Sequence, residues 1–186
     1  MKSNLVTLFA FIIFCTLTAC SKNDKVTYKI GQSLAGGVVA YVDSTGQHGL
    51  IAANTDLVGT SIWGCQNTLI GTSRNYGQGL MNTQKIVSGC SDVNSAARKC
   101  SDLIIDGKDD WFLPTFDELV LLFNNLHKKG LGGFKPSIYA SSSEANNDPV
   151  WGPSVNMIRM DFTGSSAGEQ YTPKGGLYNV RPCRYF

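Results

Sequence analysis

The chain has 186 residues, with 16 Lys and Arg against 14 Asp and Glu, and 42% of its residues are hydrophobic. A formal net charge of +2, with no cluster of Lys and Arg, gives no argument for a nucleic-acid partner. The length allows one domain with a real core.

The first 19 residues have the pattern of a secretory signal peptide. Lys2 supplies a positive start, and a largely apolar run extends from Leu5 to Leu17. A membrane-spanning helix needs about 20 residues, so this run fits a signal core better than a span. Leu17-Thr18-Ala19-Cys20 resembles the bacterial lipobox, which implies cleavage before Cys20 and acylation of its thiol. We therefore expect a lipidated tether over residues 20–27 and a cell-envelope lipoprotein of the outer membrane. The alternative is an ordinary signal peptide.

Four cysteines remain for the folded part of the chain: Cys65, Cys90, Cys100 and Cys183. An even number in an exported protein favours two disulfides, although four cysteines permit three pairings. Metal ligation is the rival interpretation. Because no C-x-x-C pair occurs and both histidines are far from any cysteine in sequence, we expect no metal and no cofactor.

The expected domain begins with a hairpin and a long polar region. Gly36–Val42 and Gly49–Ala53 have strand-like composition on either side of a turn, which predicts a β-hairpin. Residues 54–90 are rich in Gly, Asn, Ser and Thr, and so long a region is unusual unless it is functional or tied down. Its predicted tethers are Trp63, Cys65 and Cys90. Ile86 and Val87 are expected to pack inward.

Two helices are expected next. Apolar residues at helical spacing from Ala96 to Ile104 predict the first helix, which should stop at Gly107 and bury Cys100. Thr115 and Glu118 have the spacing of a capping box and predict the start of the second. An apolar stripe follows the cap, and Gly130 ends the helix. The stripe consists of Leu119, Leu122, Phe123 and Leu126.

Four carboxylates in the stretch DDWFLPTFDEL, residues 109–119, could suggest a catalytic pair. Asp117 and Glu118 fit the first turn of a helix, and Asp109 and Asp110 fit a polar turn. These structural roles account for all four. A glycoside-hydrolase pair remains an alternative, because the separation of two carboxylates cannot be read from sequence.

After Phe134, short strand-like segments alternate with turns containing Pro and Gly. The candidate strands are Ile138–Ser142, Val150–Val155, Met157–Phe162 and Tyr178–Tyr185. No internal repeat or domain break is visible. Two helices between β segments predict a single α+β domain over residues 28–186.

A set of motifs spread over this domain resembles a known family. They are GGVVAYVDSTGQHGLIAA (36–53), AARKC (96–100), GKDDWFLPTFDEL (107–119), YASSSE (139–144), Trp151 and VRPCRYF (180–186). Together they look like the domain at the C-terminus of the Legionella collagen-like adhesin, which is similar to C-type lectin-like domains. The resemblance implies a lectin-like fold in which Cys100 pairs with Cys183, leaving Cys65 to pair with Cys90.

The resemblance implies a non-catalytic binding or adhesion module for a glycan or protein ligand. Our candidate ligand-binding residues are Glu144, Asn146, Asn147, Trp151 and Tyr171, since aromatic and amide groups suit such contacts. For Trp151, burial in the core is the alternative. The cluster at 144–148 could offer oxygens to calcium, but a plain polar loop is the better interpretation. The other function classes are a structural subunit of a surface assembly and a carboxylate-based glycoside hydrolase.

Overall fold

The computed structural model describes residues 25–164 and 167–186. The predicted signal peptide and Cys20 lie outside these residues, as does most of the tether. Within the described part of the chain, every named helix and strand lies between Ser33 and Tyr185. A chain that begins at Ser21 therefore keeps every contact reported below. None of the described helices is both long and apolar enough to span a membrane.

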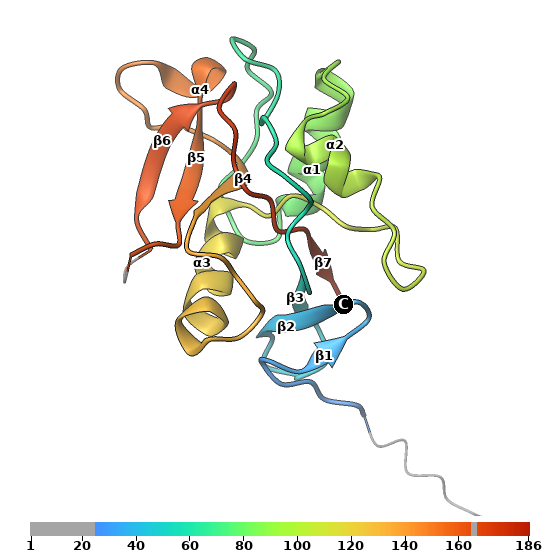
Figure 1. Ribbon diagram of the computed structural model, residues 1–186. Helices are drawn as coiled ribbons and strands as arrows, with labels where there is room; N and C mark the ends of the chain where they lie inside the picture. The colour runs from blue at the N-terminus through green and yellow to red at the C-terminus, as the bar shows by residue number, and fades with distance from the viewer. Residues whose placement is uncertain (1–24, 165–166) are drawn as a thin grey trace, which may run out of the picture.

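The first sheet joins the two ends of the domain. It is antiparallel, in the order β1 (Ser33–Leu34), β2 (Gly37–Val42), β3 (Gly49–Ala53) and β7 (Cys183–Tyr185). The predicted hairpin is confirmed by the pairing of β2 with β3, and β7 lies beside β3 through the Ala52–Cys183 pair (Figure 1). The last strand is shorter than expected.

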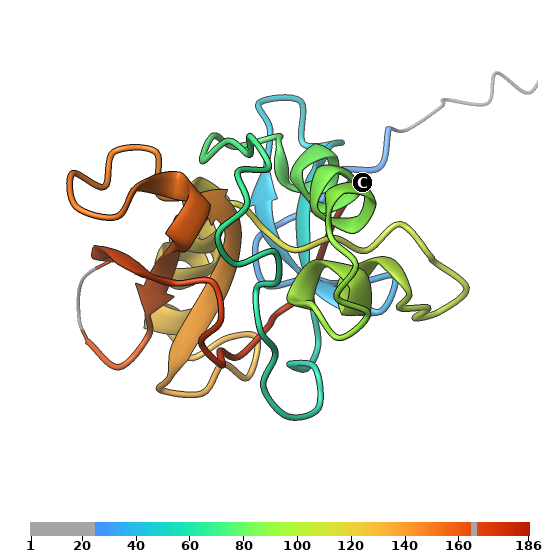
Figure 2. The ribbon, with the colours of Figure 1, turned by 90° about the horizontal axis from the view of Figure 1, so that it is seen from above.

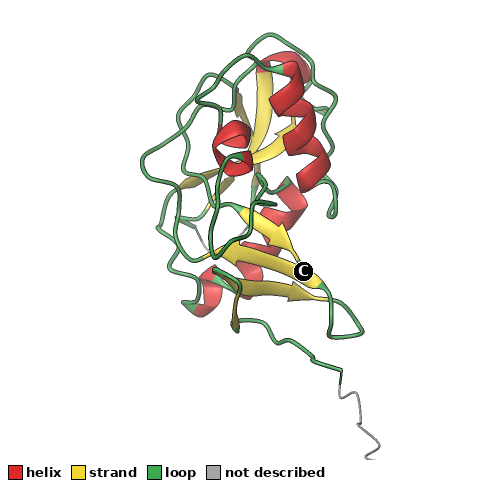
Figure 3. Ribbon diagram, turned by 90° about the vertical axis from the view of Figure 1, so that its right-hand side faces the viewer, coloured by secondary structure: helices red, strands yellow, loops and turns green. Residues whose placement is uncertain are grey.

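The second sheet is also antiparallel and lies above the first in Figures 1 and 3, in the order β4 (Ile138–Glu144), β5 (Asn156–Asp161) and β6 (Glu169–Pro173). Strand β6 was not predicted. The predicted strand Val150–Val155 is wrong, because its last four residues form the short helix α4 (Gly152–Val155). Gly152 has a φ of 67°, outside strand conformation, and Pro153 has no N–H to donate to a sheet.

Helix α1 (Gly79–Gly89) was expected only as a short segment with inward-packing residues, and Ile86 is indeed buried. The side chain of its N-cap residue, Gln78, makes no capping hydrogen bond, so the usual start signal is missing. Helix α2 (Ala96–Ser101) begins at the cap Ser95 and ends earlier than predicted. It does bury Cys100, as expected.

Helix α3 (Phe116–Asn125) has the predicted capping box. The Thr115 hydroxyl accepts a hydrogen bond from the Glu118 N–H at 3.1 Å, and the Glu118 carboxylate accepts one from the Thr115 N–H at 2.8 Å. A 3₁₀ turn, η1 (His127–Lys129), follows, and Gly130 closes it with a φ of 68°. The predicted apolar stripe is buried and packs against residues of both sheets. Because these side chains pack against both sheets, α3 joins the two sheets. Burial of each side chain contributes roughly 1.5–3 kcal/mol to stability.

The long region after β3 is tied down along its length. Residues 54–78 pass between the second sheet and the pair α1 and α2 (Figure 2). The Leu57 N–H donates to the Val180 carbonyl at 2.9 Å, and the Trp63 N–H donates to the Lys174 carbonyl at 3.0 Å. Trp63 is fully buried, which confirms it as a tether.

One of the two expected disulfides is formed. Cys65 and Cys90 are bonded, which closes the polar region onto the end of α1. The expected Cys100–Cys183 bridge is not formed. Both cysteines are free and buried. They belong to different apolar clusters, Cys100 with Trp63 and Cys183 with Leu50, and burial raises the pKa of both thiols. The surroundings therefore favour neutral, packed thiols.

Candidate functional site

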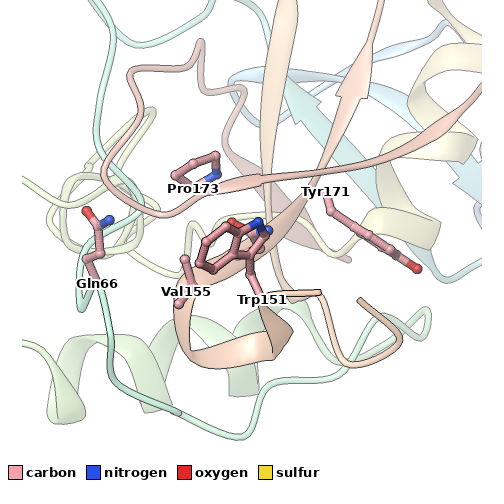
Figure 4. Close-up of a pocket in the computed structure, with 6 residues that line it drawn as sticks. Gln66, Trp151, Val155, Tyr171 and Pro173 are labelled. Atoms are coloured by element: carbon pink, nitrogen blue, oxygen red, sulfur yellow. The ribbon is translucent and has the colours of Figure 1, made fainter. Parts of the chain in front are cut away.

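A pocket of about 470 Å³ opens where the second sheet, α4 and the polar region meet. Its lining residues come from segments far apart in sequence: Gln66, Trp151, Val155, Asn156, Tyr171 and Pro173. Figure 4 shows Trp151 between Gln66 and Tyr171 in this view, with Val155 and Pro173 beside it. The lining carries no charged side chain.

Cross-strand pairing sets one side of this pocket. Asn156 on β5 pairs with Pro173 on β6, and Ile158 pairs with Tyr171. Because strand faces alternate with period two, Asn156, Tyr171 and Pro173 lie on the same face of the sheet. The sheet thus places an amide, a phenol and a proline ring together.

Trp151 is the most exposed large side chain of the pocket. Its exposed fraction is 66%, and that of Tyr171 is 37%. The alternative that Trp151 belongs to the core is therefore wrong. Two of the five sequence-predicted binding residues, Trp151 and Tyr171, are brought together in the pocket.

The Asp148 carboxylate organises the loop that presents Trp151. Its Oδ1 accepts hydrogen bonds from the backbone N–H groups of Val150 at 2.9 Å and Trp151 at 3.3 Å. Its Oδ2 accepts one from Asn156 Nδ2 at 2.6 Å. The hydrogen bond from Val150, with those from Asn156 and Trp151, lowers the pKa of Asp148, and desolvation opposes this shift. One carboxylate thus connects the loop to the floor of the pocket.

Glu144 lies away from the pocket, in the interior. Its carboxylate accepts hydrogen bonds from the N–H groups of three successive residues, Ile70, Gly71 and Thr72, at 2.7–2.9 Å. It also forms an ion pair with Lys174 at 2.6 Å, and both side chains are fully buried. These contacts occupy the carboxylate with structural partners.

Lys174 completes this buried cluster. Its Nζ donates to the Thr68 carbonyl at 2.7 Å and lies 4.5 Å from the centre of the Trp63 ring. Desolvation lowers the pKa of Lys174, although the hydrogen bond and charge of Glu144 act in the opposite direction. The pair holds the segment that carries Gln66 against the second sheet.

Asn146 and Asn147 are exposed and do not line the pocket. The Asn146 side chain donates to the Thr72 carbonyl at 3.2 Å, which links the loop after β4 to the polar region. Sequence reasoning missed Gln66 and Asn156, which do line the pocket. Asn156 becomes adjacent to Pro173 only through β6, the strand that was not predicted.

Three of the four acids of the 109–119 stretch have structural partners. Asp117 forms an ion pair with Arg74 at 3.3 Å, and Asp110 forms one with Arg184. Glu118 is buried in the capping box and also accepts hydrogen bonds from the Gly77 N–H at 2.9 Å and from the Tyr185 hydroxyl. Burial raises the pKa of Glu118, and these hydrogen bonds oppose the shift.

Two smaller pockets lie elsewhere. One, of about 330 Å³, is lined in part by Asp56, Leu103 and Ile105, and Asp56 is paired with Arg181 at 2.7 Å. The other, of about 310 Å³, includes His48 and Tyr185 in its lining. Neither lining contains two carboxylates.

Among residues 25–164 and 167–186, no three His, Cys, Asp or Glu side chains gather as potential metal ligands. No family model matches the chain, and a search of curated proteins finds no significant match.

Proposed function

We propose that this protein is a lipid-anchored binding module of the bacterial cell envelope, which holds a glycan or protein ligand at the Trp151 pocket without catalysis. The observation that carries the proposal is the 66% exposure of Trp151 beside a cavity lined by amide, aromatic and apolar groups. Concave sites with this composition are typical of ligand recognition. An exposed aromatic ring with a polar edge is a common anchor for sugars and for proteins.

The anchor and scaffold belong to the same proposal. The lipobox before Cys20 supports acylation, and the membrane, through that lipid, is the expected partner besides the ligand. The resemblance to the collagen-like adhesin domain supports a C-type lectin-like fold. Two antiparallel sheets with helices between β segments are compatible with that assignment. An adhesive role follows by analogy.

The two other function classes receive less support. Strand β6 lies at the edge of its sheet, and its exposed residues include Glu169 and Gln170, which discourage edge-to-edge assembly. A hydrolase would need two free carboxylates across a cleft, whereas Asp110, Asp117 and Glu118 are engaged in structural contacts. A non-catalytic site therefore remains the proposal.

The test uses the soluble chain from Ser21, applied to a glycan array and to an array of surface proteins, with calcium and with a chelator. We expect at least one saturable ligand that Trp151→Ala no longer binds, independently of calcium. Val93→Ala, which shortens another exposed apolar side chain outside the pocket, is the matched control and should bind as the wild type does. The proposal fails if no ligand binds, or if binding is unaffected by Trp151→Ala.

A further inference from the structure

The pocket that includes His48 and Tyr185, of about 310 Å³, lies where β7 leads to the point marked C in Figure 1. Three segments far apart in sequence supply its lining: His48, Gly49, Tyr76, Gly77, Tyr185 and Phe186. It shares no lining residue with the Trp151 pocket. No Lys or Arg lines it, and most of its side chains are aromatic.

The rings of Tyr76 and Tyr185 form a corner of this pocket. Their centroids are 6.3 Å apart, and their planes are inclined at 71°. Tyr41 lies 5.1 Å from Tyr76, and Phe112 lies 4.5 Å from Tyr185, so each ring is supported by a neighbour. Tyr76 still remains 41% exposed. The electron-rich faces of such rings attract cations.

The carboxylate of Glu118 lies directly behind this lining. Its Oε1 accepts hydrogen bonds from the Gly77 N–H at 2.9 Å and from the Tyr185 hydroxyl, and both residues line the pocket. No ion pair of the described residues includes Glu118. Only neutral donors and the N-terminal dipole of α3 therefore balance its charge, whereas buried acids are usually paired with a cation.

Other charges near the pocket are mainly negative. Desolvation raises the pKa of Tyr76 to about 12, with smaller contributions from Tyr41 and from the charges of Glu118 and Asp43. Arg74, two residues before Tyr76, is paired with two carboxylates, those of Asp117 and Glu169. A cation that enters the pocket would therefore meet a negative potential.

We propose that this pocket binds a small quaternary ammonium cation of the size of choline, whose methyl groups contact the rings of Tyr76 and Tyr185. The charge of Glu118 attracts the cation, but its side chain is fully buried, so no ligand reaches its oxygens. A primary ammonium needs acceptors to replace its hydrating water, whereas a quaternary ammonium has no N–H to satisfy. Ring faces beside an inaccessible negative charge therefore favour the quaternary cation. This site goes beyond the proposed function and does not depend on it.

Nuclear magnetic resonance titration of the wild-type chain from Ser21 with choline tests the inference, at about pH 8, where an ordinary imidazole is neutral. We expect saturable shifts of the Tyr76 and Tyr185 ring signals and of the Gly77 amide. The neutral isostere dimethylbutanol, in which carbon replaces the nitrogen, should bind at least about tenfold more weakly.

Two further probes define the cation. Ethanolamine should bind more weakly than choline, because its primary ammonium loses hydrogen bonds to water in the pocket. Phosphocholine adds a phosphate to the same cation, and the negative surroundings should weaken its binding. This comparison separates a free cation from the headgroup of a lipid.

Tyr76→Ala removes one ring of the corner and should weaken choline binding by about tenfold. Leu177→Ala shortens another exposed apolar side chain, outside all three pocket linings, and is the matched control that should bind choline like the wild type. Glu118→Gln keeps the size of the side chain and removes its charge. It should weaken choline binding by about fivefold or more and leave dimethylbutanol binding unchanged.

The absence of a saturable choline shift at Tyr76 and Tyr185 would overturn the inference. So would dimethylbutanol, ethanolamine or phosphocholine binding as tightly as choline, or unchanged choline affinity in folded Tyr76→Ala or Glu118→Gln. If Glu118→Gln does not fold, the comparison of choline with dimethylbutanol on the wild-type chain decides the role of charge. None of these outcomes depends on whether the Trp151 pocket binds a ligand.

Discussion

The two sides of the Trp151 pocket are held in place by different means. The wall that carries Gln66, residues 64–72, is fixed from within by the Cys65–Cys90 disulfide and by the buried pair of Glu144 and Lys174. The wall that carries Trp151, residues 145–151, is fixed by the carboxylate of Asp148 at the surface.

Glu144 and Asp148 are four residues apart, and both accept backbone N–H bonds, yet they serve different purposes. Glu144 is inaccessible to solvent and stabilises the interior, whereas Asp148 organises groups beside the proposed ligand pocket. The comparison teaches that burial, rather than residue type, decides whether a carboxylate in this short segment supports the fold or the proposed site. The predictions below test that difference, from the largest expected effect to the smallest.

Lys174→Met should produce one of the two largest losses of stability. It leaves the Glu144 carboxylate buried without its countercharge, and breaking a buried pair in this way typically costs about 3–5 kcal/mol. Urea unfolding of the chain from Ser21 measures the change. The double variant Lys174→Met/Glu144→Gln should lose less, because no uncompensated charge remains. Lys25→Met, at an exposed lysine, is the control; an equal loss there would contradict the assignment.

Cys65→Ser together with Cys90→Ser should lower the free energy of unfolding by about 3.5 kcal/mol, as the chain-entropy model predicts for a sequence separation of 25. The Gln66 wall should loosen while the Asp148 loop is retained.

Thiol titration of the unreduced wild-type chain from Ser21 checks which cysteines are bonded. It should find no reactive thiol in the native chain and two in the unfolded chain. If it finds none in both states, Cys100 and Cys183 are bonded after all.

Protonation of the Asp148 carboxylate at low pH should release the loop that carries Trp151. The folded-state pKa of Asp148 lies below its ordinary value of 3.8, so its stabilising bonds are present above that pH. They are lost as the pH falls below 3.8 through the lowered folded-state value. The shift of the Trp151 indole N–H signal with pH measures this release.

Asp148→Asn should remove that acid transition or displace it strongly. Asp43→Asn, at another partly exposed aspartate with a lowered pKa, here in the hairpin turn, is the matched control and should keep the transition at Trp151. A wild-type transition that survives in Asp148→Asn would show that another group holds the loop.

Trp151→Ala should change the free energy of unfolding by no more than about 0.5 kcal/mol, because most of the ring is already in water. Trp63→Ala makes the same truncation immediately before the opposite wall, where the ring is fully buried and its Nε1 donates to the Ser141 carbonyl at 2.9 Å. That variant should cost about 3–5 kcal/mol. Similar losses in both variants would remove the distinction between the walls.

Local patterns in the sequence were sufficient for several elements. The β2–β3 hairpin, the capping box of Thr115 and Glu118, and the apolar stripe of α3 all formed as predicted. Each depends on residues within a few positions of one another, through turn chemistry, a side-chain cap or helical periodicity. The expected export and the even cysteine number also predicted disulfide chemistry, of which one bridge is present.

Only the tertiary structure decided the site. Trp151 and Tyr171 were visible as candidates, but Asn156 joined them through the pairing of β5 with the unpredicted β6. Glu144 was a plausible ligand residue until three N–H groups from residues 70–72 and Lys174 surrounded it. The physical reason is that burial and hydrogen-bond partners at these positions come from residues tens of positions away, and no local pattern encodes such partners.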